Sequence, residues 1–393
     1  MKFSKLGRNT LAAGISLVMG LGLTACSRDY TAAYIYAPSA SGGAITAYGV
    51  DYQTGILNQI SGSPFTSQLK NPISAIPSPN GKYLYEIGGD QDSKVEVFSI
   101  GTDGKLYGQQ TPNITGTYPT GAAVDTTGTF LYVTYEYQIG YGPASTGPGG
   151  VTIFPIQSDG TLGTAVNVNL DYAPVGIAIT APVTNSGNAV FAYVAQQETT
   201  SDGVVTEYQV NTTTGNLTAI GSIHAGVNPS AIIVEPTARY VYVSDKTSNQ
   251  IYGFQLSASG TLSALSSSPY STDLYPLAMT IDPRGKYLYT ANYNGNTVSG
   301  FTINHADGSL GAISGTGTFK TSTGPRCVVV DPAVGNYLYT ANYLDNSVSG
   351  AQLKSEDGTL SSVANTPFTG VTEPSCVATV PNGDHALSYV YPN

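Results

Sequence analysis

One stretch of the sequence occurs twice with almost the same skeleton. Residues 275–310 read YPLAMTIDPRGKYLYTANYNGNTVSGFTINHADGSL, and residues 324–360 read GPRCVVVDPAVGNYLYTANYLDNSVSGAQLKSEDGTL. A proline followed by a short apolar run recurs along the chain with a period of roughly 47 to 55 residues, which is typical of a repeat architecture. These prolines are Pro72, Pro119, Pro174, Pro229, Pro276, Pro325 and Pro374. The chain is therefore predicted to contain seven structural units.

Each unit reads as four short strands. In the first of the two copies, apolar runs at 278–281, 287–291 and 297–303 are separated by turn residues, and an Asp-Gly turn at 307–308 precedes a fourth run. Four antiparallel strands at this spacing indicate a propeller blade, because radial repetition leaves only short, protected sheet edges. The predicted fold is all-β, a seven-bladed β-propeller of four-stranded antiparallel blades.

The first unit lacks an inner strand of its own. Residues 34–57 align without a gap on 287–310, whereas the last proline-led run, 374–380, has no complete unit after it. We therefore expect the ring to close by joining N- and C-terminal strands in one sheet. Residues 385–391 also read like a second strand, so the sequence leaves open which terminus supplies that strand.

Composition supports an all-β chain and excludes one class of partner. The sequence has 46 Gly, 29 Tyr, no Trp and 10% charged residues, which favours turns and strands over helices. Its net charge of −10 excludes the positive surface that nucleic acid requires. There is no GxSxG, HExxH, phosphate-binding loop or CxxC, so nucleophilic, zinc and nucleotide chemistry have no motif to support them. No cofactor or metal site is predicted, although hard-cation binding by acidic turn residues stays open without a calcium-loop spacing. We expect a monomer.

The N-terminus reads as an export signal. Residues 1–25 combine early Lys and Arg residues with an apolar stretch, 11–23, that is shorter than the ~20 residues a membrane span needs. The following Leu-Thr-Ala-Cys, which ends at Cys26, resembles a bacterial lipoprotein box. This resemblance implies cleavage before Cys26, lipidation of Cys26, a tether over 26–32 and a propeller over 33–393.

The expected location is the cell envelope, with the lipid at Cys26 as the membrane contact. Ser27 follows the cysteine, and the absence of Asp there implies outer-membrane sorting in a host with two membranes. An ordinary signal peptide with an incidental cysteine is the alternative.

Cys327 and Cys376 each lie two residues after a blade-opening proline. The equivalent positions in the other units hold small residues, as a tapering centre would require. The sequence therefore favours two packing cysteines, while an exported protein keeps a disulfide between them possible.

Candidate site residues fall on one predicted face. The turns between second and third strands should lie at the same end as the start of each inner strand, and two of these turns are long, at 136–150 and 196–203. This face is expected to gather polar residues around a channel mouth, although each of them is also an ordinary turn residue. They are Asp90, Asp92, Glu136, Glu198, Asp202, Asp245, Lys246, Asn292, Tyr293, Asn342, Tyr343 and Asp345.

Arg326 is the only basic residue at its position in the seven units. A charge where its counterparts are apolar or small needs a partner, either a neighbouring carboxylate or an anionic ligand.

The skeleton PxxxxxDPxGKYLYTANYxxNTVSGFxIxxxDGxL resembles the seven-bladed lactonase-like propellers, which include bacterial 6-phosphogluconolactonases and fungal muconate lactonising enzymes. It also resembles the YVTN repeats of surface propellers. The resemblance covers the chain from about Tyr34 onward, and it implies an Arg, a His and a Glu at the channel mouth, from G-P-R-H and N-E-L motifs. Here Arg326 is kept, Cys327 takes the His position and Tyr343 takes the Glu position.

Three functions remain open at this point. The leading hypothesis is a binding or interaction module with a degenerate lactonase site, holding an anionic sugar or lactone through residues at the mouth: Arg326, Asp245, Asn292, Asn342 and Tyr343. The alternative is an active sugar-lactone hydrolase in which Glu136 or Glu198 is the base and Arg326 the anion clamp. A third is a structural envelope protein whose tyrosines make protein contacts.

Overall fold

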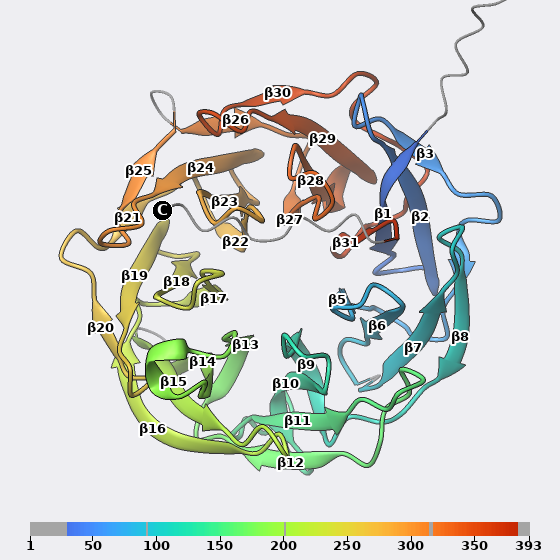
Figure 1. The fold of residues 1–393 in the computed structure, drawn as a ribbon. Helices are drawn as coiled ribbons and strands as arrows, with labels where there is room; N and C mark the ends of the chain where they lie inside the picture. Colours follow the sequence, from blue (N-terminus) through green and yellow to red (C-terminus); the bar gives the residue numbers. More distant parts are fainter. Residues whose placement is uncertain (1–29, 92, 200–201, 314–316, 384–393) are drawn as a thin grey trace, which may run out of the picture. The chain divides into compact units, whose positions relative to one another are not determined.

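The computed structural model describes residues 30–91, 93–199, 202–313 and 317–383, and these form seven antiparallel sheets around a central opening (Figure 1). The prediction of a seven-bladed β-propeller is confirmed. Among the described residues, the only helices are two short 3₁₀ turns, η1 (Thr184–Ser186) and η2 (Tyr343–Asp345). No helix in this part of the chain is long and apolar enough to cross a membrane.

The strands follow the predicted order, from the inner to the outer edge of each blade. Blade 1 contains β31 (Ala378–Pro381), β1 (Thr31–Pro38), β2 (Ala44–Asp51) and β3 (Leu57–Gln59), with β4 (Phe65–Thr66) beside β2. Blade 2 contains β5 (Ser74–Pro77), β6 (Tyr83–Ile87), β7 (Val95–Ile100) and β8 (Leu106–Gln110). Blade 3 contains β9 (Gly116–Val124), β10 (Phe130–Gln138), β11 (Gly150–Pro155) and β12 (Val166–Asn169).

The remaining four blades repeat this arrangement. Blade 4 contains β13 (Ala173–Ile179), β14 (Val190–Thr199), β15 (Asp202–Val210) and β16 (Leu217–His224). Blade 5 contains β17 (Pro229–Val234), β18 (Tyr240–Asp245), β19 (Gln250–Leu256) and β20 (Leu262–Ala264), with β21 (Tyr270–Ser271) beside β19. Blade 6 contains β22 (Pro276–Ile281), β23 (Tyr287–Asn292), β24 (Thr297–Ile303) and β25 (Leu310–Ala312), with β26 (Thr318–Lys320) beside β24. Blade 7 contains β27 (Pro325–Val330), β28 (Tyr337–Asn342), β29 (Ser347–Leu353) and β30 (Leu360–Ser362).

One tyrosine on each second strand joins its blade to the next. In blade 6, the buried Tyr289 donates a hydrogen bond of 2.7 Å to the carbonyl oxygen of Gly358 in blade 7. Gly358 has a φ of 74° in the turn after the third strand, and a Cβ there would lie 2.5 Å from the ring of Tyr287. The other six pairs are Tyr36–Gly104, Tyr85–Gly160, Tyr132–Gly215, Tyr193–Gly260, Tyr242–Gly308 and Tyr339–Gly55. The repeated Tyr and turn Gly positions therefore form the joints between blades.

The ring closes in blade 1. Strand β31 pairs with β1, from Ala33 opposite Pro381 to Tyr36 opposite Ala378, so the N-terminal segment supplies the second strand. This resolves the choice that the sequence left open. The competing segment, 385–391, lies outside the described residues.

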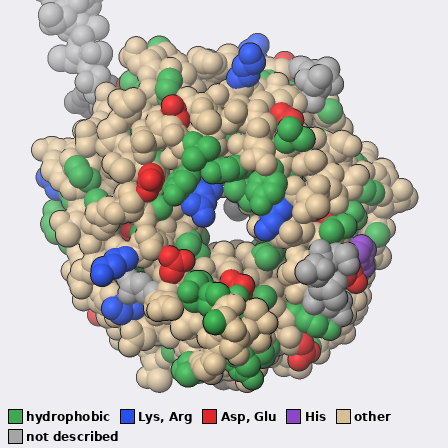
Figure 2. All heavy atoms as spheres, turned by 180° about the vertical axis from the view of Figure 1, so that it is seen from behind, with side chains coloured by type: hydrophobic (Ala, Val, Ile, Leu, Met, Phe, Trp, Pro, Cys, Tyr) green, Lys and Arg blue, Asp and Glu red, His purple; other side chains and the backbone are tan. Residues whose placement is uncertain are grey.

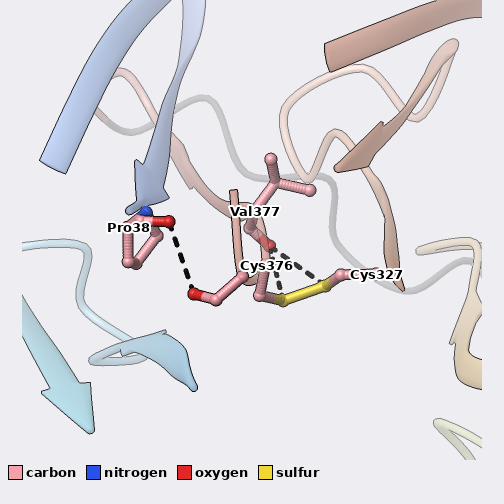
Figure 3. The surroundings of a disulfide bond; sticks show 5 residues. Pro38, Cys327, Cys376 and Val377 are labelled. Carbon is pink, nitrogen blue, oxygen red and sulfur yellow. Dashed lines mark hydrogen bonds between the residues drawn. A yellow bond between two sulfur atoms is a disulfide. The ribbon is translucent and has the colours of Figure 1, made fainter. Parts of the chain in front are cut away.

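Cys327 and Cys376 form a disulfide beside this closure (Figure 3). Their Cα atoms are 4.9 Å apart, which joins β27 of blade 7 to the segment just before β31 of blade 1. The favoured interpretation of two packing cysteines was therefore wrong. The inner strands converge toward the centre, and the convergence that requires small side chains there also brings the two sulfur atoms within bonding distance.

Two carboxyl groups are buried against each other in blade 2. Glu86 on β6 lies directly opposite Glu96 on β7, and the two residues are 0% and 2% exposed. The hydroxyl oxygen of Ser67 lies 2.5 Å from a carboxyl oxygen of Glu86 and 3.1 Å from one of Glu96, while the N–H of Gln68 donates to Glu96. Burial raises the pKa of Glu86 to about 8; the Ser67 hydrogen bond opposes this shift, and the charge of Glu96 adds to it. Glu86 is therefore protonated at neutral pH.

Candidate functional site

The ends of the second strands border the central opening on one face. Asp245, Asn292 and Asn342 are the last residues of β18, β23 and β28, and each pairs with the proline that begins the inner strand. Tyr135 has the same register opposite Pro119. The residues one position further along, Glu136, Lys246, Tyr293 and Tyr343, are therefore equivalent to one another around the opening.

Asp245, Asn292 and Asn342 do not line the opening, contrary to the expectation from sequence. All three are 0% exposed. The amide group of Asn292 donates to Thr297 and Ser299 at 3.0 and 2.9 Å, and Asn342 makes the same bonds to Ser347 and Ser349 at 3.1 and 2.9 Å. Both N–H groups of each amide are therefore used in hydrogen bonds to hydroxyl groups of the residues that follow the same turn. These side chains hold the turns in place.

Asp245 serves its turn through its carboxylate. It accepts hydrogen bonds from the backbone N–H groups of Val227, Asn228, Thr247 and Ser248. Burial acts to raise the pKa of Asp245, but these four donors outweigh it and hold the pKa below its usual value. Asp245 is therefore an ionised anchor for the loop beside the opening.

Arg326 is presented by a β-bulge. The pairing of β27 with β28 shifts register between Pro325 and Cys327, so Arg326 is the extra residue, and bulges commonly redirect a side chain next to a functional site. Its side chain is exposed, with the guanidinium carbon 5.0 Å from the centre of the Tyr343 ring. Within the described part of the chain, no carboxylate pairs with Arg326. The carboxylate partner considered from the sequence is therefore not found there.

The equivalent bulge residue in blade 5 behaves differently. Ser230 donates to the carbonyl oxygen of Pro276 at 2.6 Å and lies 2.9 Å from the hydroxyl of Ser244. In that blade the bulge position joins two inner strands, whereas in blade 7 it projects a cation.

Lys246 and Glu136 face the same opening. Lys246 is half-buried; burial lowers its pKa, and the carboxylates of Asp245 and Glu136 act in the opposite direction. Glu136 belongs to blade 3 and Lys246 to blade 5. The charge of Glu136 nevertheless acts on the pKa of Lys246, although the sheet of blade 4 stands between theirs in the ring. Figure 2 shows basic side chains on two sides of the central opening. The sequence placed Lys246 on this face but assigned it no role. Its position in the repeat, which is equivalent to that of Glu136, could have identified it as a residue at the opening.

Glu136 is followed along β10 by a tyrosine. The neighbouring carboxylate of Glu136, followed by burial, raises the pKa of Tyr137 to about 12. The ring of Tyr118 packs edge-on against Tyr137, with the ring centres 5.4 Å apart. One ring of this aromatic pair therefore belongs to the residue next to Glu136 in the sequence of β10.

The other predicted acids are engaged locally or lie outside the description. Asp90 accepts from Asn71, Asp345 accepts from Ser347, and Asp202 lies 2.5 Å from a ring nitrogen of His224. Asp92 and the side chain of Glu198 lie outside the described residues. Within the described ranges, no three His, Cys, Asp or Glu residues are grouped closely enough to hold a metal ion.

The site can hold an anion, but it lacks a conventional base at the two altered positions. Cys327 is bonded to Cys376 and is therefore not a thiolate, and Tyr343 lies under the guanidinium of Arg326. Arg326 and Lys246 supply positive charge at the opening, where a guanidinium binds carboxylate or phosphate well. Glu136 is the carboxylate that remains near them.

Comparisons with known proteins agree with this architecture. Residues 30–178 and 191–314 match the family model of the lactonase, seven-bladed β-propeller. A crystal structure of a candidate 6-phosphogluconolactonase from Bacteroides fragilis is 20% identical with a TM-score of 0.71, covering 90% of this chain and 99% of that one. The Pseudomonas aeruginosa periplasmic gluconolactonase PpgL is 16% identical with a TM-score of 0.70, covering 88% and 99%. At such identities the structural likeness establishes the fold alone. No relative was found among curated protein sequences.

Proposed function

The chain belongs to the seven-bladed β-propeller lactonase family. From this premise we propose that it is a binding module that has kept the arginine expected to hold an anion and has lost the His and Glu expected to take part in hydrolysis. The observation that carries the proposal is Arg326. This exposed cation stacks on Tyr343 and has no carboxylate partner in the described chain. The positions expected to hold His and Glu are a disulfide-bonded Cys327 and Tyr343, so Arg326 is left without a base beside it.

The expected ligand is a sugar acid or another small anion. An unpaired guanidinium beside an aromatic ring can bind a carboxylate through two parallel hydrogen bonds, while the ring limits where the ligand lies. Lys246 adds a second cation at the same opening.

The test is stabilisation of the purified protein by inorganic phosphate and by gluconate, measured as the unfolding temperature and by calorimetric titration. Both anions should stabilise the wild type but not Arg326→Ala. The matched control is Arg239→Ala. Arg239 is also exposed and stacked on a tyrosine, with its guanidinium carbon 5.4 Å from the centre of the Tyr240 ring. It lies just before the second strand β18, at the opposite end of the blade from the proposed site. Equal stabilisation of the wild type and Arg326→Ala would refute the proposal.

A second candidate is a sugar-lactone hydrolase with a rearranged site. The feature in its favour is that the charge of Glu136 acts to raise the pKa of Lys246, so a carboxylate and a cation are both present at this face. Turnover of gluconolactone or 6-phosphogluconolactone that is lost in both Glu136→Gln and Arg326→Ala would establish this candidate over the binding module.

We also propose that the protein is exported and anchored through lipidated Cys26. The motif at residues 23–26 supports this proposal. The Cys327–Cys376 disulfide supports export, because such bonds persist mainly in oxidising compartments.

A further inference from the structure

Exposed apolar side chains surround the opening on the face that carries Arg326. Ile139 and Tyr141, in the loop between β10 and β11, are 82% and 46% exposed. Leu274, just before β22, is 54% exposed, and Leu344, in η2, is 56% exposed. Figure 2 shows hydrophobic side chains gathered around the opening on this face. An exposed apolar surface of this kind, rimmed by polar residues, commonly marks an interaction site.

Two tyrosines continue this surface in blade 6. The rings of Tyr275 and Tyr293 lie 6.3 Å apart, and the N–H of Tyr293 donates to the carbonyl oxygen of Tyr275. Both are partly exposed. We call the whole surface the apolar rim, defined by Ile139, Tyr141, Leu274, Tyr275, Tyr293 and Leu344.

The charges within and around the apolar rim differ in sign. Arg326, Lys246 and Glu136 lie at the opening, where the charge of Glu136 acts on Lys246, whereas Asp90, Asp202 and Asp345 belong to the turns of the same face. Arg326 is therefore the central cation that no carboxylate of the described chain offsets, and a ligand that fills this face is expected to bring negative charge to it and apolar groups to the rim. Charge complementarity of this kind fixes which partner binds and in which position.

We propose that the apolar rim and the two central cations form a docking surface for an extended protein segment in which acidic side chains are flanked by aliphatic or aromatic ones. This inference rests on the proposed function in one respect, that Arg326 is an anion site. The acidic side chain would meet Arg326 and Lys246, and its apolar neighbours would cover the rim. Tyrosine and arginine are enriched among the residues that dominate protein interfaces.

Two other occupants fit the face less well. A polysaccharide could stack on the tyrosines, but it offers nothing to Ile139, Leu274 and Leu344, whose aliphatic side chains require an apolar partner. An anionic membrane would be repelled by the acidic turns of this face and by the protein's net charge of −10.

The test is a selection of displayed random peptides on the purified protein. Enriched peptides should carry Asp or Glu next to Leu, Ile, Phe, Tyr or Trp. Synthetic copies should bind the wild type and bind at least about tenfold more weakly to a rim variant with Ile139→Asp and Leu344→Asp, and also to Arg326→Ala. Tyr107→Asp is the control, because Tyr107 is 54% exposed on the outer strand β8 and its loss should leave the affinity unchanged. Circular dichroism and the unfolding temperature would verify that each variant is folded.

Three outcomes would overturn the inference: no enrichment over the starting library, enriched peptides without acidic residues, or binding that the rim variant retains. Rim-dependent sedimentation of Cys26→Ala protein with phosphatidylglycerol vesicles, in the absence of peptide binding, would replace the protein partner with a membrane surface. Failure here is distinct from failure of the proposed function. If phosphate and gluconate still stabilise the wild type but not Arg326→Ala, only the docking surface is refuted.

Discussion

Replacing Glu86 by glutamine should stabilise the protein by an amount that grows with pH. The pKa of this buried carboxyl is about 8 in the folded chain, against an ordinary value of 4.5. Between these two values the folded state keeps a proton that the unfolded state releases, so the wild type loses about 1.4 kcal/mol of stability per pH unit. The loss reaches roughly 3 kcal/mol at pH 7 and roughly 5 kcal/mol above pH 8. Glutamine has nearly the shape of the protonated acid and never ionises, so Glu86→Gln avoids this loss.

The measurement is urea unfolding followed by tyrosine fluorescence and circular dichroism at pH 4.5, 7 and 9. The free energy of unfolding of Glu86→Gln minus that of the wild type should be near zero at pH 4.5 and should rise to its full value at pH 9. Glu356→Gln, at an exposed turn position, provides the control and should show no such rise. A difference that is flat across this pH range, or a variant less stable than the wild type at pH 9, would refute the assignment of a proton to Glu86.

Three further predictions concern closure, anchoring and the site. Replacing both Cys327 and Cys376 by serine should cost about 4 kcal/mol of unfolding free energy, because the bond closes a loop across a sequence separation of 49 residues; calorimetry with and without reductant checks this, and unchanged stability would contradict it. Cys26→Ala should move the protein from the membrane fraction to the soluble fraction of its host, and a variant that still sediments with membranes would require another anchor. Asp245→Ala should lower the unfolding free energy by about 3 kcal/mol, because four backbone N–H groups lose their acceptor. The folded Asp245→Ala protein should still bind phosphate, and selective loss of that binding would return Asp245 to the site.

The architecture could be predicted because repetition makes each unit evidence for the others. The proline-led runs and the turn glycines recur at similar spacings, so the seven blades and the incomplete first unit could be predicted from the sequence. The pairing of Tyr289 with Gly358 was not foreseen, although both positions recur in each unit. The spacing of residues within one unit does not indicate which residue of the next unit they contact.

The site was predicted less well than the fold. Asp245, Asn292 and Asn342 were placed at the correct ends of their strands, but a pattern of residues does not say whether a polar side chain turns toward the opening or back into its own loop. The next position along the chain, which holds Glu136 and Lys246, is the one that faces the opening. Cys327 shows a related limit, because a preference for small residues at a converging centre is satisfied equally by packing and by a bond.

The tyrosine joints described above place the same kind of hydrogen bond at every boundary between blades. The last of them, from Tyr339 to Gly55, closes the ring with the same 2.7 Å bond that joins blades 6 and 7. These hydrogen bonds alone single out no first blade, and the boundary between blades 7 and 1 is distinguished by its disulfide. The strands β31 and β1 of blade 1 could be linked and the chain opened in a turn of another blade. The permuted protein would retain all seven tyrosine joints, and its stability would depend on how well the new terminal strands pair with their blade.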